Sequence, residues 1–128
     1  GDIVAVSGHV VIVDKVGADP FGIKRLKSIN DCSSLDSKYF DFVVSQSSPS
    51  KNGIGLNRYV AKDYLKESSK MMEAFKGIGK AVCQAYFSNK NVATPSSTYG
   101  IIRHTGSKDC LSPKIAMVNQ SCVNQCLQ

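Results

Sequence analysis

Two apolar, β-branched runs at the start of the chain constrain its fold more than any other feature. The runs "IVAV" (3–6) and "HVVIVD" (9–14) are separated only by Ser7 and Gly8. Isoleucine and valine are stiff at χ1 and suit the pleated, half-buried surface of a sheet. The pattern therefore predicts two strands, or one bent strand, joined at Ser7–Gly8.

Three later segments also have strand character. The segment "YFDFVVSQ" (39–46) carries apolar residues at alternate positions, whereas "IGLNRYV" (54–60) and "YGIIRH" (99–104) are shorter candidates. A turn with Pro and two Gly (17–22) follows the opening runs, and residues 23–37 favour no single element. Together the strand segments predict an antiparallel sheet of about four to six strands.

One long helical pattern lies between these strands. Apolar residues recur at helical spacing from about Ala61 to Phe87. Gly77 and Gly79 interrupt this run, and we expect a break or kink there because glycine destabilises a helix interior by roughly 1 kcal/mol relative to alanine. At 128 residues the chain is long enough for one core. The sequence thus predicts a single α+β domain over 1–128, an antiparallel sheet with one main helix packed on it. The residues expected to be mostly buried are Val11, Val13, Phe42, Val44, Phe75 and Val82.

His9 is unusual because a titratable ring opens a strand on its core-facing side. Alternation places its side chain on the face of Val11 and Val13, and it places Gln46 on the face of Phe42 in the next strong strand. If the two strands pair antiparallel, the start of one lies near the end of the other, so we expect His9 and Gln46 to lie within hydrogen-bonding reach or to share one water. A buried amide can hold an imidazole in one tautomer, which is the orienting role in a nucleophile–base arrangement.

The charge balance of the chain is basic. Sixteen Lys and Arg against ten Asp and Glu give a formal net charge of +6, which favours an anionic partner such as nucleic acid, an envelope polymer or a membrane surface. The basic residues are scattered singly and are not interleaved with aromatics, so no specific nucleic-acid partner is expected. No apolar stretch approaches the ~20 residues of a membrane-spanning helix. The opening run carries Asp2 in place of a cationic segment, so it is not expected to be a signal peptide.

The five cysteines favour an oxidising compartment. Three of them crowd the C-terminal region (88–128), where they predict disulfide bracing of an irregular extension. Cys122 and Cys126 are four residues apart, a helical spacing that rarely meets disulfide geometry. Each should therefore pair with a different partner among the remaining cysteines, Cys110, Cys32 and Cys83. No CxxC pair occurs and the chain has two histidines, so neither a metal site nor a cofactor is expected.

At these residues the sequence resembles a known family. The segment "GDIVAVSGHVVIVDKV" is similar to the "GD(I/L)V…GHVGIY" segment of the NlpC/P60 papain-like cysteine peptidases, which cleave bacterial cell-wall peptides. The segment "FDFVVSQSSPSKNGIGLNRYVAKDYL" resembles the family's next strand, loop and strand. The resemblance covers residues 1–65, although the 17–38 stretch is longer than the usual link. It implies a papain-like half or permuted domain in which His9 is the general base and Gln46 orients its ring.

The resemblance leaves the nucleophile open, because the family's "DCSG" cysteine precedes the GD segment, with which this sequence begins. In one interpretation the nucleophile lies upstream and was lost by truncation or processing. An N-terminal fragment of the same precursor is then expected as a partner. Without that fragment, Val11 and Val13 should border an uncovered gap. A second interpretation follows the circularly permuted branch, with Cys83 of "GKAVCQAYF" as nucleophile. In the third, the protein is a non-catalytic relative. "DCSSL" (31–35) echoes the motif, but too few residues follow for a helix, so Cys32 is expected to be a disulfide partner.

The first functional hypothesis is therefore a cysteine hydrolase that acts on peptide or amide bonds of peptidoglycan, in the periplasm, in the cell envelope or outside the cell. In this mechanism His9 takes a thiol proton, the thiolate attacks the amide carbonyl, and Gln46 holds the imidazole. The alternative is a secreted, disulfide-braced binding module without chemistry of its own. A third class is a small basic nuclease that uses His9 and His104 as an acid–base pair.

Overall fold

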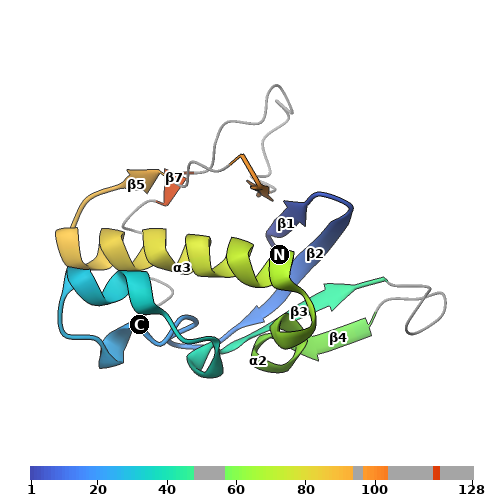
Figure 1. Ribbon diagram of the computed structural model, residues 1–128, viewed down its shortest axis with the longest axis horizontal. Coiled ribbons are helices and arrows are strands. Elements are labelled where there is room, and N and C mark those ends of the chain that lie inside the picture. The colour runs from blue at the N-terminus through green and yellow to red at the C-terminus, as the bar shows by residue number, and fades with distance from the viewer. Residues whose placement is uncertain (48–56, 94–96, 104–116, 119–128) are drawn as a thin grey trace.

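A five-stranded antiparallel sheet with a long helix across one face makes up most of the described chain (Figure 1). The computed structural model describes residues 1–47, 57–93, 97–103 and 117–118, and the structural statements below concern these residues. From one edge to the other, the strands are β4 (Asn57–Val60), β3 (Phe42–Gln46), β2 (His9–Val16), β1 (Ile3–Val6) and β6 (Tyr99–Ile102). The helix is α3 (Ser69–Ser88). The predicted α+β class, with an antiparallel sheet and one main helix, is confirmed.

The opening runs form a tight hairpin. Strand β1 pairs with β2 in a register that places Val6 opposite His9. Gly8 in the connecting turn has φ +83°, a left-handed conformation that side chains other than glycine rarely adopt. The interpretation as two strands joined at Ser7–Gly8 is therefore confirmed over that of one bent strand. A bulge between Val13 and Lys15 shifts the register of β2 against β3.

The other predicted strands are shorter than their sequence patterns. Strand β3 begins at Phe42 because the residues before it form a 3-10 turn, η3 (Ser37–Tyr39), which the Asp36 side chain caps by accepting from the Lys38 amide. The 23–37 segment, for which the sequence favoured no element, forms the 3-10 helices η1 (Ile23–Arg25) and η2 (Ile29–Ser34).

The last described strands belong to two different sheets. Strand β6 joins the main sheet as an edge strand beside β1. A separate two-stranded sheet pairs β5 (Val92–Ala93) with β7 (Met117–Val118). The region beyond residue 88, expected to be an irregular extension, therefore contributes one strand to the main sheet.

The long helical pattern breaks at a different place from the one predicted. It divides into α2 (Ala61–Tyr64), the 3-10 turn η4 (Leu65–Glu67) and α3, and the division falls at Ser68, whose Oγ caps α3 by accepting from the Met71 amide. Gly77 and Gly79 lie inside the continuous helix α3, so the expected break there is wrong. A Cβ on Gly79 would lie 2.7 Å from Leu35 Cδ1, and one on Gly77 would lie 2.6 Å from the Tyr99 hydroxyl. The two glycines therefore allow close packing against the helix.

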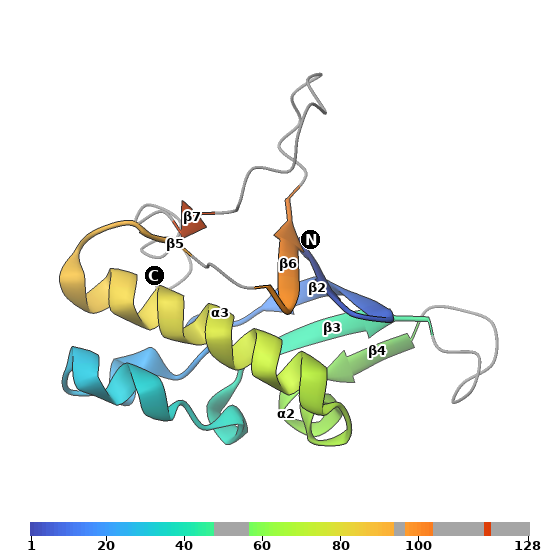
Figure 2. The same cartoon turned by 45° about the horizontal axis from the view of Figure 1, so that its top comes forward.

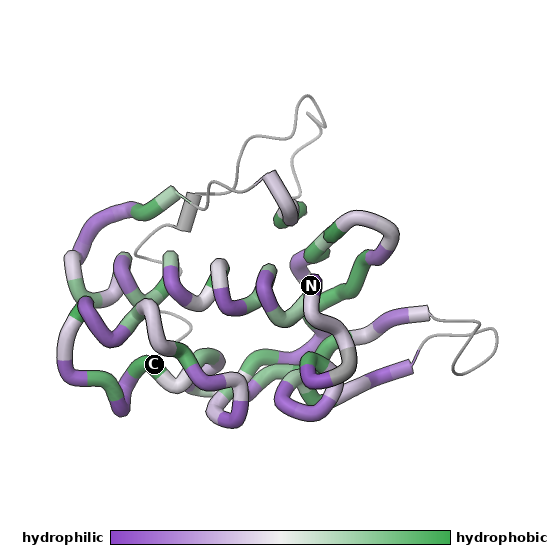
Figure 3. The backbone as a smooth tube through the Cα atoms, viewed as in Figure 1, coloured by the Kyte–Doolittle hydropathy of each residue, from purple (hydrophilic) through white to green (hydrophobic). Residues whose placement is uncertain are grey.

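The core lies between α3 and the sheet (Figure 2). Hydrophobic and hydrophilic residues alternate along α3, and the apolar residues of β1 to β3 extend beneath it (Figure 3). Four of the six residues expected in the core are fully buried, Val11, Phe42, Val44 and Phe75. The other two, Val13 and Val82, are partly buried against it.

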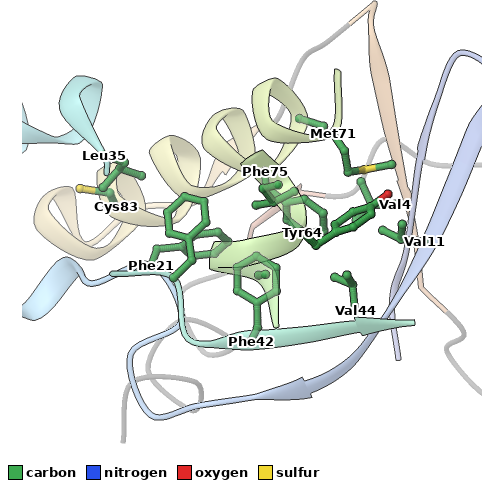
Figure 4. Packing of buried hydrophobic residues seen from close by; sticks show 14 of the residues in the cluster. Val4, Val11, Phe21, Leu35, Phe42, Val44, Tyr64, Met71, Phe75 and Cys83 are labelled. Carbon is green, nitrogen blue, oxygen red and sulfur yellow. The ribbon is translucent and has the colours of Figure 1, made fainter. Parts of the chain in front are cut away.

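Val11 tests the idea of an uncovered gap beside His9. Its side chain is only 1% exposed and packs in one cluster with Tyr64 and Met71 (Figure 4). The expectation that truncation would leave Val11 bordering an open gap is therefore wrong, because α2 and the first turn of α3 cover this face of the sheet.

One disulfide ties η2 to α3. It joins Cys32 to Cys83 across 51 residues of chain, with the two Cα atoms 5.6 Å apart and both side chains buried. Closing a loop of this length stabilises the fold by about 4 kcal/mol in the chain-entropy account. The prediction that Cys32 is a disulfide partner is confirmed. Because Cys32 and Cys83 pair with each other, only Cys110 is left as a partner for Cys122 and Cys126, so the expectation that each of these two has its own partner is wrong. Cys110, Cys122 and Cys126 themselves lie outside the described residues.

Candidate functional site

Three side chains from three elements meet at one end of the core, and we refer to His9, Gln46 and Tyr64 as the His9 cluster. The Nε2 atom of His9 is hydrogen-bonded to Oε1 of Gln46 and lies 3.1 Å from the hydroxyl of Tyr64. The Tyr64 hydroxyl in turn donates to Oε1 of Gln46 at 2.7 Å. The predicted contact between His9 and Gln46 is confirmed.

The strand register explains this meeting. Strands β2 and β3 are antiparallel, with Ile12 opposite Ser45, so the next core-facing position on β3 is Gln46. His9 lies diagonally across from it on the same face, at a separation that long side chains span. Gln46 is 5% exposed, and its amide therefore depends on protein partners.

The third member, Tyr64, was not singled out from the sequence. It ends α2, directly after β4, and its ring packs on the core at 7% exposure and against the ring of Tyr59. A buried tyrosine usually finds a partner for its hydroxyl. That rule was the available signal, but it does not say which polar group the hydroxyl reaches.

The hydrogen bonds favour one tautomer of His9. An amide oxygen only accepts hydrogen bonds, and Oε1 of Gln46 faces both His9 Nε2 and the Tyr64 hydroxyl. Both partners are satisfied when the Nε2 atom carries the proton. The Nδ1 atom then keeps its lone pair and is the basic nitrogen of the ring. His9 itself is partly exposed, so Nδ1 belongs to a ring that other molecules can approach.

Cys83 does not belong to this cluster. Its sulfur is bonded to Cys32, and a disulfide sulfur cannot act as a thiolate nucleophile. Figure 4 shows Cys83 at the opposite end of the core from Tyr64 and Val11. The permuted interpretation therefore loses its proposed nucleophile in this oxidised structure.

The remaining sequence candidates are not placed by the structure. His104, which the nuclease hypothesis pairs with His9, lies outside the described residues, as do the three C-terminal cysteines. Among the described residues, no group of three or more His, Cys, Asp or Glu side chains is arranged to hold a metal ion. None of the helices in the described ranges is long and apolar enough to cross a membrane.

An ion pair lies on the opposite face of the same sheet. Arg58 of β4 bonds the carboxylate of Asp14, which also accepts from the Ser45 hydroxyl at 3.3 Å. The hydrogen bond from Arg58 is the main cause that lowers the pKa of Asp14 below its usual value. This pair ties β2 to β4 across β3, and so supports the sheet that carries the His9 cluster.

Comparisons with known proteins leave the family open. No protein-family model, curated protein or solved structure matches this chain. The similarity to the NlpC/P60 peptidases thus rests on the residues quoted above, and what it implies for function is a proposal.

Proposed function

We propose that the His9 cluster is the base half of a hydrolase that cleaves peptide or amide bonds by nucleophilic acyl transfer. The observation that supports this most directly is the Nε2 bond to the Gln46 amide oxygen. It holds the ring in the tautomer whose Nδ1 can accept a proton. A general base held in this way typically contributes about 10²- to 10⁴-fold to the rate.

The reaction requires a thiol from outside the described residues. Both described cysteines, Cys32 and Cys83, are consumed in the disulfide. We place the nucleophile on another cysteine of the chain or on a preceding segment of its precursor. His9 Nδ1 takes the thiol proton, and the thiolate adds to the carbonyl carbon. The proton returns to the leaving nitrogen as the C–N bond breaks, and water then hydrolyses the thioester with the same base.

Bacterial cell-wall peptides are the substrate class that we propose. The resemblance of residues 1–65 to the NlpC/P60 segment supports it, and so does the formal charge of +6, which favours an anionic wall polymer. The buried disulfide suits a periplasmic, envelope or secreted location, since such bonds persist in oxidising compartments.

The test is whether the full product of the gene hydrolyses purified peptidoglycan. Hydrolysis is measured as the release of new amino groups. We expect cleavage that iodoacetamide abolishes, and His9→Ala should lower kcat/KM by at least about 10²-fold. The matched control is His104→Ala, which removes the other histidine and should leave the rate unchanged. Absence of hydrolysis, or full activity of His9→Ala, would refute the proposal.

A tautomer measurement tests the same site without activity. In the neutral ring, ¹⁵N shifts should show the proton of His9 on Nε2. Gln46→Ala should lose that preference, whereas Gln84→Ala, a glutamine truncation on α3, should retain it. A wild-type ring protonated on Nδ1 would contradict the assignment of the base.

A binding module without chemistry is the second candidate, and the oxidised Cys32–Cys83 pair is the observation that favours it. This candidate predicts that the protein binds peptidoglycan without cleaving it and that His9→Ala binds as tightly as the wild type. The hydrolysis assay therefore separates the two candidates.

A further inference from the structure

A hollow of about 560 Å³ lies between the start of α3 and the end of the sheet nearest the first hairpin. It is bounded by the end of β1, by the first two turns of α3 and by the start of β6. Figure 2 shows these three elements converging on one side of the molecule. The volume is within the range of sites that bind small molecules.

The strand register connects this hollow to His9. Val6 lines the hollow and pairs with both His9 of β2 and Tyr99 of β6. Directly opposite residues in an antiparallel pair have Cβ atoms about 5 Å apart. His9 therefore lies on the strand next to Val6, which lines the hollow.

The Nε2 contact with Gln46 leaves the Nδ1 edge of the His9 ring on the side away from that amide. Nε2 is directed at Gln46 on β3. In an imidazole, Nδ1 lies on the other side of the ring axis from Nε2, so the Nδ1 edge is turned away from β3. Strand β1 and the hollow are on that side of β2.

The lining of the hollow carries one charge of each sign. Lys70 and Glu73 both line it, three residues apart on α3, and within the described part of the chain neither forms an ion pair. Residues at this spacing have Cβ atoms about 5–6 Å apart. Hydroxyl side chains from Ser7 and Thr98 add polar groups to the wall.

We propose that this hollow binds a short zwitterionic peptide, with its free ammonium group on Glu73 and its carboxylate on Lys70. The inference rests on the proposed function, because it supplies the substrate end that would lie beside Nδ1 of His9. The charges of Lys70 and Glu73 on one wall match the two ends of such a peptide. The preference for a free peptide over one with a blocked end should be modest, since exposed charge pairs change an affinity by up to about fivefold.

The experiment is an NMR titration of the protein with alanyl-alanine in three forms: free, N-acetylated and C-amidated. We expect the free dipeptide to shift the amides of Val6 and Tyr99 and to bind about three- to fivefold more tightly than either blocked form. Glu73→Gln should bind the free and N-acetylated forms equally, and Lys70→Gln should bind the free and C-amidated forms equally. Lys80→Gln, a charge removal on the same helix outside the hollow, should behave as the wild type.

Several results would overturn the proposal: equal affinity for all three forms, no binding, or shifts centred away from Val6 and Tyr99. Dipeptide binding and peptidoglycan hydrolysis are measured separately on the wild-type protein, which distinguishes this site from the catalytic proposal. Binding without hydrolysis would retain the peptide site and refute the enzyme. Hydrolysis without dipeptide binding would refute the site alone.

Discussion

The hydroxyl of Tyr64 donates to the side-chain oxygen of Gln46 over 2.7 Å, and the same oxygen accepts from His9. Tyr64 therefore acts on His9 through this shared acceptor, in addition to its own 3.1 Å contact with His9 Nε2, and we regard it as a positioning residue. A fixed acceptor restricts where the imidazole can lie, because an amide that has a second hydrogen bond cannot rotate freely.

Tyr64→Phe should loosen His9 without unfolding the protein. The change removes one buried hydrogen bond, for which we expect a loss of about 1 kcal/mol in the free energy of unfolding. Activity on peptidoglycan should fall through kcat, and the ¹⁵N shifts of His9 should move toward a mixture of tautomers. Tyr86→Phe, on α3, is the control. Unchanged ¹⁵N shifts in Tyr64→Phe would show that the hydroxyl is only structural.

Breaking the disulfide should affect stability and not the site. Cys32→Ala together with Cys83→Ala should lower the free energy of unfolding by about 4 kcal/mol, because the unfolded chain regains the entropy of a 51-residue loop. Urea denaturation measures this loss. The rate per folded molecule should stay unchanged, since Cys83 lies at the far end of the core. Loss of activity in a variant that remains folded would restore Cys83 as a nucleophile candidate.

Replacing Gly77 or Gly79 with alanine should distinguish the effect of helix propensity on stability from the effect of side-chain packing. Both substitutions favour the helix by roughly 1 kcal/mol. At Gly79 the new Cβ would meet Leu35 and Phe21, both buried, so overpacking should outweigh that gain and destabilise by about 1–2 kcal/mol. At Gly77 the contact is the tip of Tyr99, which can shift, so the net change should be close to zero. Thermal or urea unfolding of the two variants checks this difference, and equal effects would contradict it.

The Asp14–Arg58 pair should make stability depend on pH in the acid range. The folded state lowers the pKa of Asp14 below the usual 3.8, chiefly through the hydrogen bond from Arg58. A group with a depressed folded pKa binds its proton more weakly when folded, so its contribution is present above pH 3.8 and disappears as pH falls through the folded pKa. Asp14→Asn should therefore unfold more easily than the wild type at neutral pH, and the difference should vanish in acid. A difference that persists at the lowest pH would indicate lost packing in place of lost charge.

Local sequence patterns determined much of the first hairpin and two of the three residues of the His9 cluster. Alternation along a strand has a period of two residues and needs no knowledge of distant parts of the chain. It therefore placed His9 and Gln46 on core-facing positions, and antiparallel pairing brought them together. The junction at Ser7–Gly8 came from the same local reasoning, which left two strands or one bent strand open; the left-handed φ of Gly8 in the structure decided for two strands.

Tertiary structure decided what depends on contacts between distant segments. The helical pattern broke at Ser68, where a serine cap was available, while Gly77 and Gly79 stayed helical because their neighbours pack closely. Cys32 and Cys83 paired across 51 residues, a choice that spacing alone left open among five cysteines. The hydroxyl of Tyr64 reached Gln46 only because α2 packs over the end of the sheet. Hydrophobic periodicity specifies which face of an element is buried, but packing of the whole core selects what each buried group touches.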